Sequence, residues 1–138
     1  MVEKDRIVIT TGKRKTCVAR AKVKEGTGLI TINGKPLDIY TPEYSRLKIR
    51  EVLLMAENLS KKVDIKVNVR GGGVSSQADA IRQSIAKGIV EFFNDENLKK
   101  IYLDHDRNLL IYDFRRTEPH KPSRSRKGAR RHKQRSKR

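Results

Sequence analysis

The chain has 138 residues, of which 33 are Lys or Arg and 16 are Asp or Glu, so its net charge near pH 7 is +17. This length provides one ordinary domain and is too short for an enzyme with separate cofactor and substrate domains. So much positive charge makes the chain repel itself unless a polyanion neutralises it, and nucleic acid is the commonest such partner. A merely soluble surface needs a net charge of only roughly 2–8 in magnitude. The composition therefore favours a nucleic-acid partner.

The charge divides the chain into two parts after Phe114. Residues 115–138 hold 12 basic side chains and one acid, whereas residues 1–114 hold 21 basic and 15 acidic side chains. Ala129 is the only hydrophobic residue of the second part, so burial there cannot offset an ordering cost of roughly 1–2 kcal/mol per residue. We expect a globular RNA-binding body at 1–114 and an extended basic tail at 115–138 that is disordered without RNA.

The first predicted strand spans residues 16–24, where small or apolar side chains alternate with larger, mostly polar ones. Cys17 takes an inward position, so we interpret it as a small buried residue rather than a reactive thiol. Arg20, Lys22 and Lys24 share the other side of the strand and should project together.

A hairpin or meander is predicted next. Residues 29–32 form a short apolar strand, and Asn33-Gly34 supplies the residue types that tolerate a positive φ in a tight turn. The turn leads toward the next extended segment of the hairpin or meander, at 37–40. Thr41-Pro42 then resembles an N-cap followed by proline at the first helical position.

Two helices and one strand follow in the sequence. The first helix is indicated by apolar residues at helical spacing: Ile49, Leu53, Ala56 and Leu59. Strict alternation predicts a half-buried strand at 63–70 that ends at a triple glycine. We expect a second helix to open immediately after the glycines, where Ser76 and Asp79 have the spacing of a capping box. Its apolar stripe is formed by Ala78, Ile81, Ile85, Ile89 and Phe92.

A short third helix at 97–103 and an apolar stretch at 109–114 complete the body. This order of elements indicates an α/β (α+β) two-layer sandwich, in which a mixed β-sheet carries helices on one face. Basic side chains such as Arg20 and Lys22 are then left on the other face.

The triple glycine, Gly71, Gly72 and Gly73, allows three interpretations. It can be a tight turn where larger residues would clash, a contact to RNA phosphate at a helix N-terminus, or, with less support, a nucleotide cradle. It lacks the Walker ending and the dinucleotide spacing. Gly73-Val74-Ser75-Ser76 is similar to the loop of a family of small-molecule kinases, but those enzymes need a second domain.

No catalytic or metal-binding pattern stands out. We find no Ser, His and Asp set and no paired carboxylates, and Asp104-His105-Asp106 is better interpreted as a solvated helix end than as a metal site. The chain has one cysteine and no zinc-finger spacing. We therefore predict no enzyme activity, no cofactor, no metal and no small-molecule substrate. Without a lipidation signal, a leader or an 18-residue apolar run, we expect a cytoplasmic protein with no membrane partner.

The aromatic residues bear on how RNA would be recognised. All seven lie between Tyr40 and Phe114, and the aromatic pattern of an RNA-recognition sheet is absent. Base stacking along single strands is therefore disfavoured, and phosphate and shape contacts to folded RNA are favoured.

Several blocks together resemble a known family. They are Gly12-Lys13-Arg14-Lys15-Thr16 with Val18-Ala19-Arg20, then Ile32-Asn33-Gly34, then Gly71-Gly72-Gly73-Val74-Ser75 with Gln77-Ala78-Asp79-Ala80-Ile81-Arg82, and finally Lys127-Gly128-Ala129-Arg130-Arg131 with the Gln134-Arg135-Ser136-Lys137-Arg138 terminus. In this order they resemble the ninth protein of the small ribosomal subunit over nearly the whole chain. Residues 114–119 and Lys121-Pro122 look archaeal, while Ser76 replaces a glycine common in bacterial members.

The resemblance implies a fold like the second domain of the fifth small-subunit protein. It also implies a structural place in the subunit head, with the 3′ major domain of the rRNA, P-site tRNA and neighbouring head proteins as partners. The expected rRNA-binding residues are Lys13, Arg14, Lys15, Arg20, Arg70, Gly71, Gly72, Gly73, Arg124, Arg126, Lys127, Arg130, Arg131 and Lys133. The expected tRNA-binding residues are Arg135, Ser136, Lys137 and Arg138. A stand-alone nucleic-acid chaperone or compaction protein is the alternative that the charge alone permits.

Overall fold

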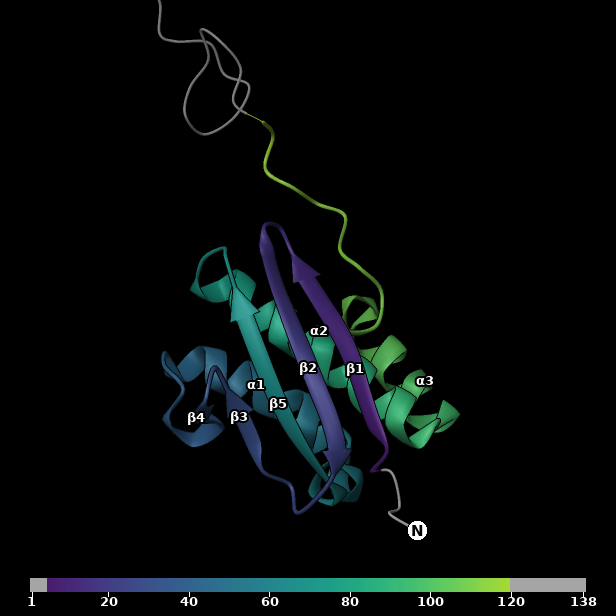
Figure 1. Cartoon of the computed structure of the whole chain (residues 1–138). Coiled ribbons are helices and arrows are strands. Elements are labelled where there is room, and N and C mark those ends of the chain that lie inside the picture. The colour runs from purple at the N-terminus through teal and green to yellow at the C-terminus, as the bar shows by residue number, and fades with distance from the viewer. Residues whose placement is uncertain (1–4, 120–138) are drawn as a thin grey trace, which may run out of the picture.

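A computed structural model of the chain describes residues 5–119. Five strands form one sheet in the order β1-β2-β5-β3-β4 (Figure 1). The strands are β1 (Ile7–Arg14), β2 (Cys17–Glu25), β3 (Ile30–Ile32), β4 (Lys35–Pro36) and β5 (Val63–Arg70). Neighbouring strands are antiparallel except for β3 and β5, which run parallel. The sheet is therefore mixed, as the sequence predicted.

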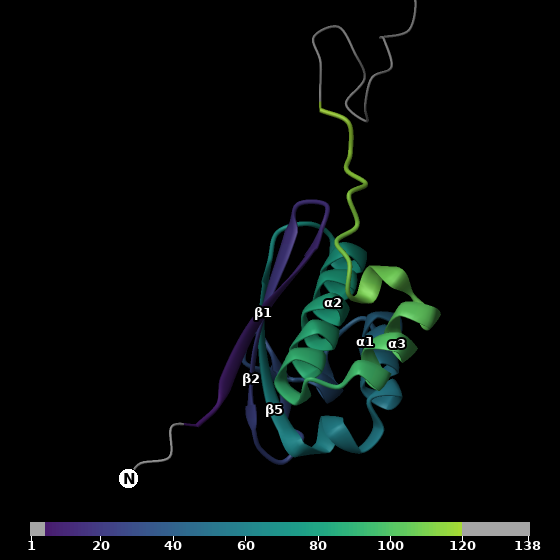
Figure 2. The ribbon, with the colours of Figure 1, turned by 90° about the vertical axis from the view of Figure 1, so that its right-hand side faces the viewer.

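The helices are α1 (Glu43–Met55), α2 (Val74–Phe93) and α3 (Glu96–His105), with short 3-10 turns η1 (Leu37–Ile39), η2 (Glu57–Lys62) and η3 (Arg107–Leu109). All three α-helices lie on the same side of the sheet, and the opposite side carries no helix among residues 5–119 (Figure 2). The predicted α+β two-layer sandwich is confirmed. The described part of the basic segment, residues 115–119, contains no helix or strand.

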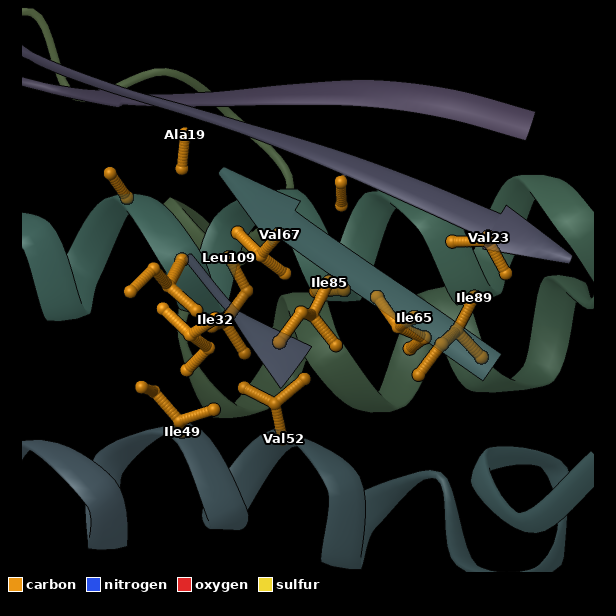
Figure 3. Close-up of a cluster of buried hydrophobic side chains, with 14 of the residues drawn as sticks. Ala19, Val23, Ile32, Ile49, Val52, Ile65, Val67, Ile85, Ile89 and Leu109 are labelled. Carbon is orange, nitrogen blue, oxygen red and sulfur yellow. The ribbon is translucent and has the colours of Figure 1, made fainter. Parts of the chain in front are cut away.

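The core lies between the sheet and the helices. Figure 3 shows Ile85 and Ile89 of α2 directed toward strand residues such as Val67, with Ile49 and Val52 of α1 closing the layer from the other side. Each of these five side chains is at most 1% exposed. Cys17 is also buried and free, which confirms its interpretation as a small core residue.

Helix α2 approaches the first strand unusually closely. A Cβ added to Gly12 would lie 2.7 Å from the Ser84 nitrogen and closer still to the Ala80 carbonyl oxygen. The hydroxyl of Thr10 donates a hydrogen bond of 2.7 Å to the Ser84 carbonyl oxygen. At Thr10 and Gly12 the inward side of β1 is therefore small or polar, because the backbone of α2 lies too close for larger side chains.

This close approach explains why the sequence analysis missed β1. Its outward positions hold Ile7 and Ile9, which are 47% and 66% exposed, while Thr10 and Gly12 face the helices. Val8 is buried as its apolar character predicts, but at the other positions from Ile7 to Gly12 the isoleucines are exposed and the buried residues are Thr10 and Gly12. By contrast, the predicted strand 63–70 coincides with β5, and the strand predicted at 16–24 is displaced by one residue in β2.

The second helix begins directly after the glycines, as predicted, but the predicted N-terminal caps of both helices were wrong. Pro42 is extended and occupies the N-cap of α1 itself, so Thr41 lies outside the helix, and the Thr41-Pro42 bond is cis. Helix α2 begins at Val74, directly after the glycines, which places Ser76 inside its first turn. Asp79 contacts Lys48 and Arg82 instead of completing a capping box.

Other predictions were right only in part. Asn33 and Gly34 both have positive φ, so the predicted turn is confirmed. Beyond it, strand β4 has only two residues and η1 replaces the expected strand at 37–40. Pro36 has no N–H for the ladder, which helps to end the strand. The third helix begins one residue before the predicted start because Asp95 caps it, accepting hydrogen bonds from two backbone N–H groups, and it ends two residues later than predicted, at His105.

Candidate nucleic-acid interface

The uncovered side of the sheet carries a row of basic side chains. Arg20 and Lys22 project from β2, and Lys66 and Arg70 project from β5, all four exposed. The register places Lys22 directly opposite Lys66 and Arg20 opposite Asn68. We call these four basic residues the cationic face. Like charges directly opposite each other destabilise a sheet by roughly 0.2–1 kcal/mol. An anionic partner would relieve this repulsion.

No residue within 5–119 forms an ion pair with any member of the cationic face. The nearby carboxylate of Asp64 is engaged elsewhere, because it accepts hydrogen bonds of 2.9 Å from the backbone N–H groups of Thr27 and Leu29. These bonds lower the pKa of Asp64 below its ordinary value, and the bond from Leu29 has the largest effect. The positive charge of the face is therefore available to a ligand.

One end of the cationic face is hollowed into a polar groove. The groove is lined by Val18, Arg20, Asn33, Asn68 and Arg70. The Asn33 side chain forms the edge of the groove and is fixed there, since it accepts a hydrogen bond from the Val69 N–H at 2.9 Å and donates one to the Val69 carbonyl oxygen at 3.4 Å. The groove thus offers two guanidinium groups and an amide from Asn68, which are groups that bind phosphate and sugar oxygens.

The triple glycine forms the turn between β5 and α2. Gly71 and Gly72 have φ values of +79° and +64°, and a Cβ at Gly71 would lie 2.9 Å from the Thr16 carbonyl oxygen. The interpretation as a tight turn is therefore correct for these two positions. Gly73 is different, because a Cβ there would meet nothing within 4 Å, and its position as the N-cap of α2 provides no side-chain hydrogen bond. Contact of this open helix N-terminus with phosphate stays a prediction.

The turn between β1 and β2 presents the predicted Lys13-Arg14-Lys15 cluster. Lys13 and Lys15 are exposed, and Lys15 has a φ of +54° at the tip of the turn. Arg14 differs from its neighbours because its side chain turns to the helix side and lies 3.5 Å from the carboxylate of Asp113. The predicted cluster therefore contributes two exposed cations and one that holds the structure together.

Three of the predicted elements meet at one end of the molecule. The β1–β2 turn, the glycine turn before α2 and the segment that follows η3 all lie at the upper end in Figure 1. The predicted Lys13, Lys15 and Arg70 belong to this end, while Arg20 lies farther along the sheet. The remaining predicted residues lie outside the described part of the chain: Arg124, Arg126, Lys127, Arg130, Arg131, Lys133, Arg135, Ser136, Lys137 and Arg138.

Sequence reasoning left two members of the cationic face out of the predicted site. Lys22 alternates with buried residues of β2, and Lys66 does the same in β5, so the pattern indicated that each is exposed. The pairing of the two strands was needed to show that they lie side by side. The role of Asp113 had no signal in the sequence.

The histidine between two aspartates, His105, takes part in local contacts at the end of α3. His105 is held by Glu51, with 2.6 Å between Nε2 and Oε1, and Asp106 caps the next turn. The described residues contain no group of three or more His, Cys, Asp or Glu side chains that could hold a metal ion. Among the helices of this same region, none combines the length and the apolar character needed to cross a membrane.

The fold and the site define a class, a two-layer α+β protein with an uncovered cationic sheet face and a strongly basic C-terminal segment. Residues 12–138 match the family described as Ribosomal protein S9/S16. The chain belongs to this family. A relative from Methanococcus maripaludis is 47% identical over 131 residues, covering 95% of this chain and 98% of the relative. One from Thermoplasma volcanium is 51% identical over 129 residues, covering 94% and 96%.

Both relatives carry the name "Small ribosomal subunit protein uS9". A third relative with this name, from Methanococcus vannielii, is 47% identical over 131 residues. These source organisms are archaea, which confirms the archaeal-like character that the sequence analysis inferred from residues 114–119. The family predicted from the sequence blocks is likewise confirmed.

Proposed function

We propose that this protein is a structural constituent of the small ribosomal subunit that binds the rRNA of the subunit head. The observation that carries the proposal is the cationic face, whose four basic side chains have no ionic partner within residues 5–119 and lie on the side of the sheet without helices. Phosphates of a folded RNA would neutralise this charge and release counterions. The names of the relatives support the ribosomal part of this proposal, a place in the small subunit.

The basic segment 115–138, which we call the basic arm, extends this surface. Its described beginning leaves the body beside the β1–β2 turn, the same end at which Lys13 and Lys15 are exposed (Figure 1). The arm carries twelve basic side chains and one acid. We propose that it follows the rRNA of the 3′ major domain and that Arg135, Ser136, Lys137 and Arg138 reach the P-site tRNA. Catalysis has no part in this function.

The rRNA proposal is tested with the full-length protein and two RNA fragments of equal length. One fragment is the 3′ major domain of the small-subunit rRNA, and the other comes from a different rRNA domain. We expect tighter binding to the first fragment and co-sedimentation with small subunits in high salt. Equal binding to both, together with loss from subunits in high salt, would instead support the nucleic-acid chaperone.

The tRNA proposal is tested on small subunits reconstituted with a Lys137→Gln/Arg138→Gln variant. We expect these subunits to assemble normally and to release P-site tRNA faster. The matched control is Lys99→Gln/Lys100→Gln on the exposed surface of α3, which removes the same charge elsewhere. Equal tRNA retention by the two variants would contradict the contact between the C-terminus and tRNA.

A further inference from the structure

The chain between the body and the basic arm is held by a compact polar cluster. The Asp113 side chain is only 7% exposed. Its carboxylate accepts hydrogen bonds from Arg115, from the backbone N–H at 3.1 Å, from Nε at 3.0 Å and from Nη2 at 2.7 Å. Arg14 forms an ion pair with the same carboxylate at 3.5 Å, and its Nη1 donates a hydrogen bond of 3.1 Å to the Arg115 carbonyl oxygen. Both sides of residue 115 are thus fixed to the body.

A buried glutamine next to this cluster connects the surrounding elements by hydrogen bonds. Gln83 of α2 is 3% exposed, and its Oε1 accepts a hydrogen bond of 2.8 Å from the Lys13 backbone N–H. Its Nε2 donates to the carbonyl oxygens of Asn108 at 3.2 Å and Ile111 at 2.9 Å. One side chain therefore joins β1, α2 and the segment that leads to Asp113.

Apolar contacts do not explain why this segment is fixed. Leu109 is buried and Leu110 packs against the core, but Ile111 and Phe114 are exposed, and no helix or strand includes residues 110–119. Hydrogen bonds to charged groups are among the stronger ones in proteins. The polar cluster is therefore the structural element that sets the course of the chain after residue 112.

We propose that Arg14, Gln83 and Asp113 form an anchor that fixes where the basic arm leaves the body, so that the arm and the cationic end of the body meet one continuous RNA surface. The three are positioning residues, and the inference rests on the proposed RNA-binding function. A fixed origin raises the effective concentration of the arm near the RNA that the body already holds, and reduces the ordering needed on binding.

Substitution of Asp113 separates this anchor from simple electrostatics. Asp113→Asn keeps the side-chain shape and removes a negative charge, so charge alone predicts tighter binding to RNA. The anchor predicts the opposite, a loss of affinity of about tenfold, because residues after 112 must then be ordered at the moment of binding. Asp104→Asn is the matched control, since Asp104 is exposed on α3 and its side chain forms no hydrogen bond or ion pair within residues 5–119.

The affinity of each full-length variant is measured for the 3′ major domain fragment. The same comparison is repeated in an Arg130→Gln/Arg131→Gln background, which weakens the arm without shortening the chain. We expect the effect of Asp113→Asn to shrink in that background, because an arm that binds RNA weakly gains little from being positioned. A purely structural effect on the body would be the same in both backgrounds and would overturn the anchor.

The two proposals fail in different ways. If Arg130→Gln/Arg131→Gln leaves the affinity unchanged, the arm is not on the RNA, and the proposed function of the arm fails together with the anchor. If that variant weakens binding but Asp113→Asn binds as tightly as Asp104→Asn, only the anchor fails.

A second measurement does not depend on any variant folding. Amide hydrogen exchange in the free wild-type protein should show protection at the Arg115 N–H, which donates to Asp113, and at the Lys13 N–H, which donates to Gln83. Exchange of the Arg115 amide at the rate of an unstructured peptide would overturn the anchor, whatever the RNA-binding results.

Discussion

The two layers of the body differ in how they use charge. The five strands hold eight basic and two acidic residues, whereas α1, α2 and α3 together hold seven basic and six acidic residues. In the helix layer many cations are paired, as Arg82 is with Glu51 at 3.1 Å and Lys48 is with Asp79 at 3.2 Å. In the sheet, the cationic face has no such partners within the described residues. The excess charge of the body therefore belongs to the sheet, and the helix layer is close to neutral.

This difference shows which groups act inside the protein and which face a partner. The charge of a cation that is paired within the fold is largely neutralised by its carboxylate. An unpaired cation still attracts anions from the solvent. Arg14 and Lys13 are adjacent in the sequence and show both cases, because Arg14 contacts Asp113 whereas the side chain of Lys13 is exposed. Counting basic residues in the sequence does not make this distinction.

The largest difference in RNA affinity is expected between a variant that loses charge on the cationic face and one that loses the same charge elsewhere on the body. Arg20→Gln/Lys22→Gln/Lys66→Gln should weaken rRNA binding by roughly 50- to 100-fold near 0.15 M salt and lower the salt slope by about two to three, if each side chain neutralises one phosphate. The control Lys61→Gln/Lys99→Gln/Lys100→Gln removes the same charge away from this face and should change the affinity by less than about threefold. Filter binding over a salt series measures both quantities. Equal losses of affinity would show that RNA does not distinguish the cationic face from the rest of the body.

The contact between the layers should be sensitive to a single methyl group. Gly12→Ala places a Cβ against the backbone of α2, and overpacking of this kind costs about 1–3 kcal/mol in the free energy of unfolding. Gly73→Ala adds the same methyl group in open space, at an N-cap where the change from glycine costs only several tenths of a kcal/mol. Urea unfolding of both variants tests the difference. Equal stability would mean that α2 does not approach β1 as closely as described.

The smallest expected effect concerns the acid beside the cationic face. Because the pKa of Asp64 is lowered in the folded protein, its contribution to stability is present above the ordinary carboxyl pKa of about 4 and is lost as pH falls through the folded value. Asp64→Asn should therefore reduce stability at pH 7 and differ less from the wild type at pH 3. Urea unfolding at both pH values measures this. An equal difference at the two pH values would mean that the hydrogen bonds from Thr27 and Leu29 do not stabilise the carboxylate.

Some of the fold could be predicted because local patterns matched the tertiary environment. In β5 every second residue is buried, so alternation alone located the strand at its observed ends. The strand β1 could not be found in this way, since two exposed isoleucines flank the buried Val8 and the other inward positions are Thr10 and Gly12, so apolar residues do not alternate with polar ones. The caps of α1 and α2 were misjudged because Pro42 and Gly73, which provide no side-chain hydrogen bond, occupy the N-cap positions.

By itself, the sequence determined the charge surplus, its division after residue 114, the alternation of β2 and β5, and the blocks that identify the family. These are properties of the chain that do not depend on which elements become neighbours. Only the tertiary structure decided that Lys22 lies opposite Lys66, that Arg14 turns inward, and that Asp113 anchors the start of the basic arm. Each of these depends on groups far apart in the chain. Pairing of β2 with β5 brings Lys22 and Lys66 together, and the segment after η3, held by Gln83 of α2, brings Asp113 to Arg14.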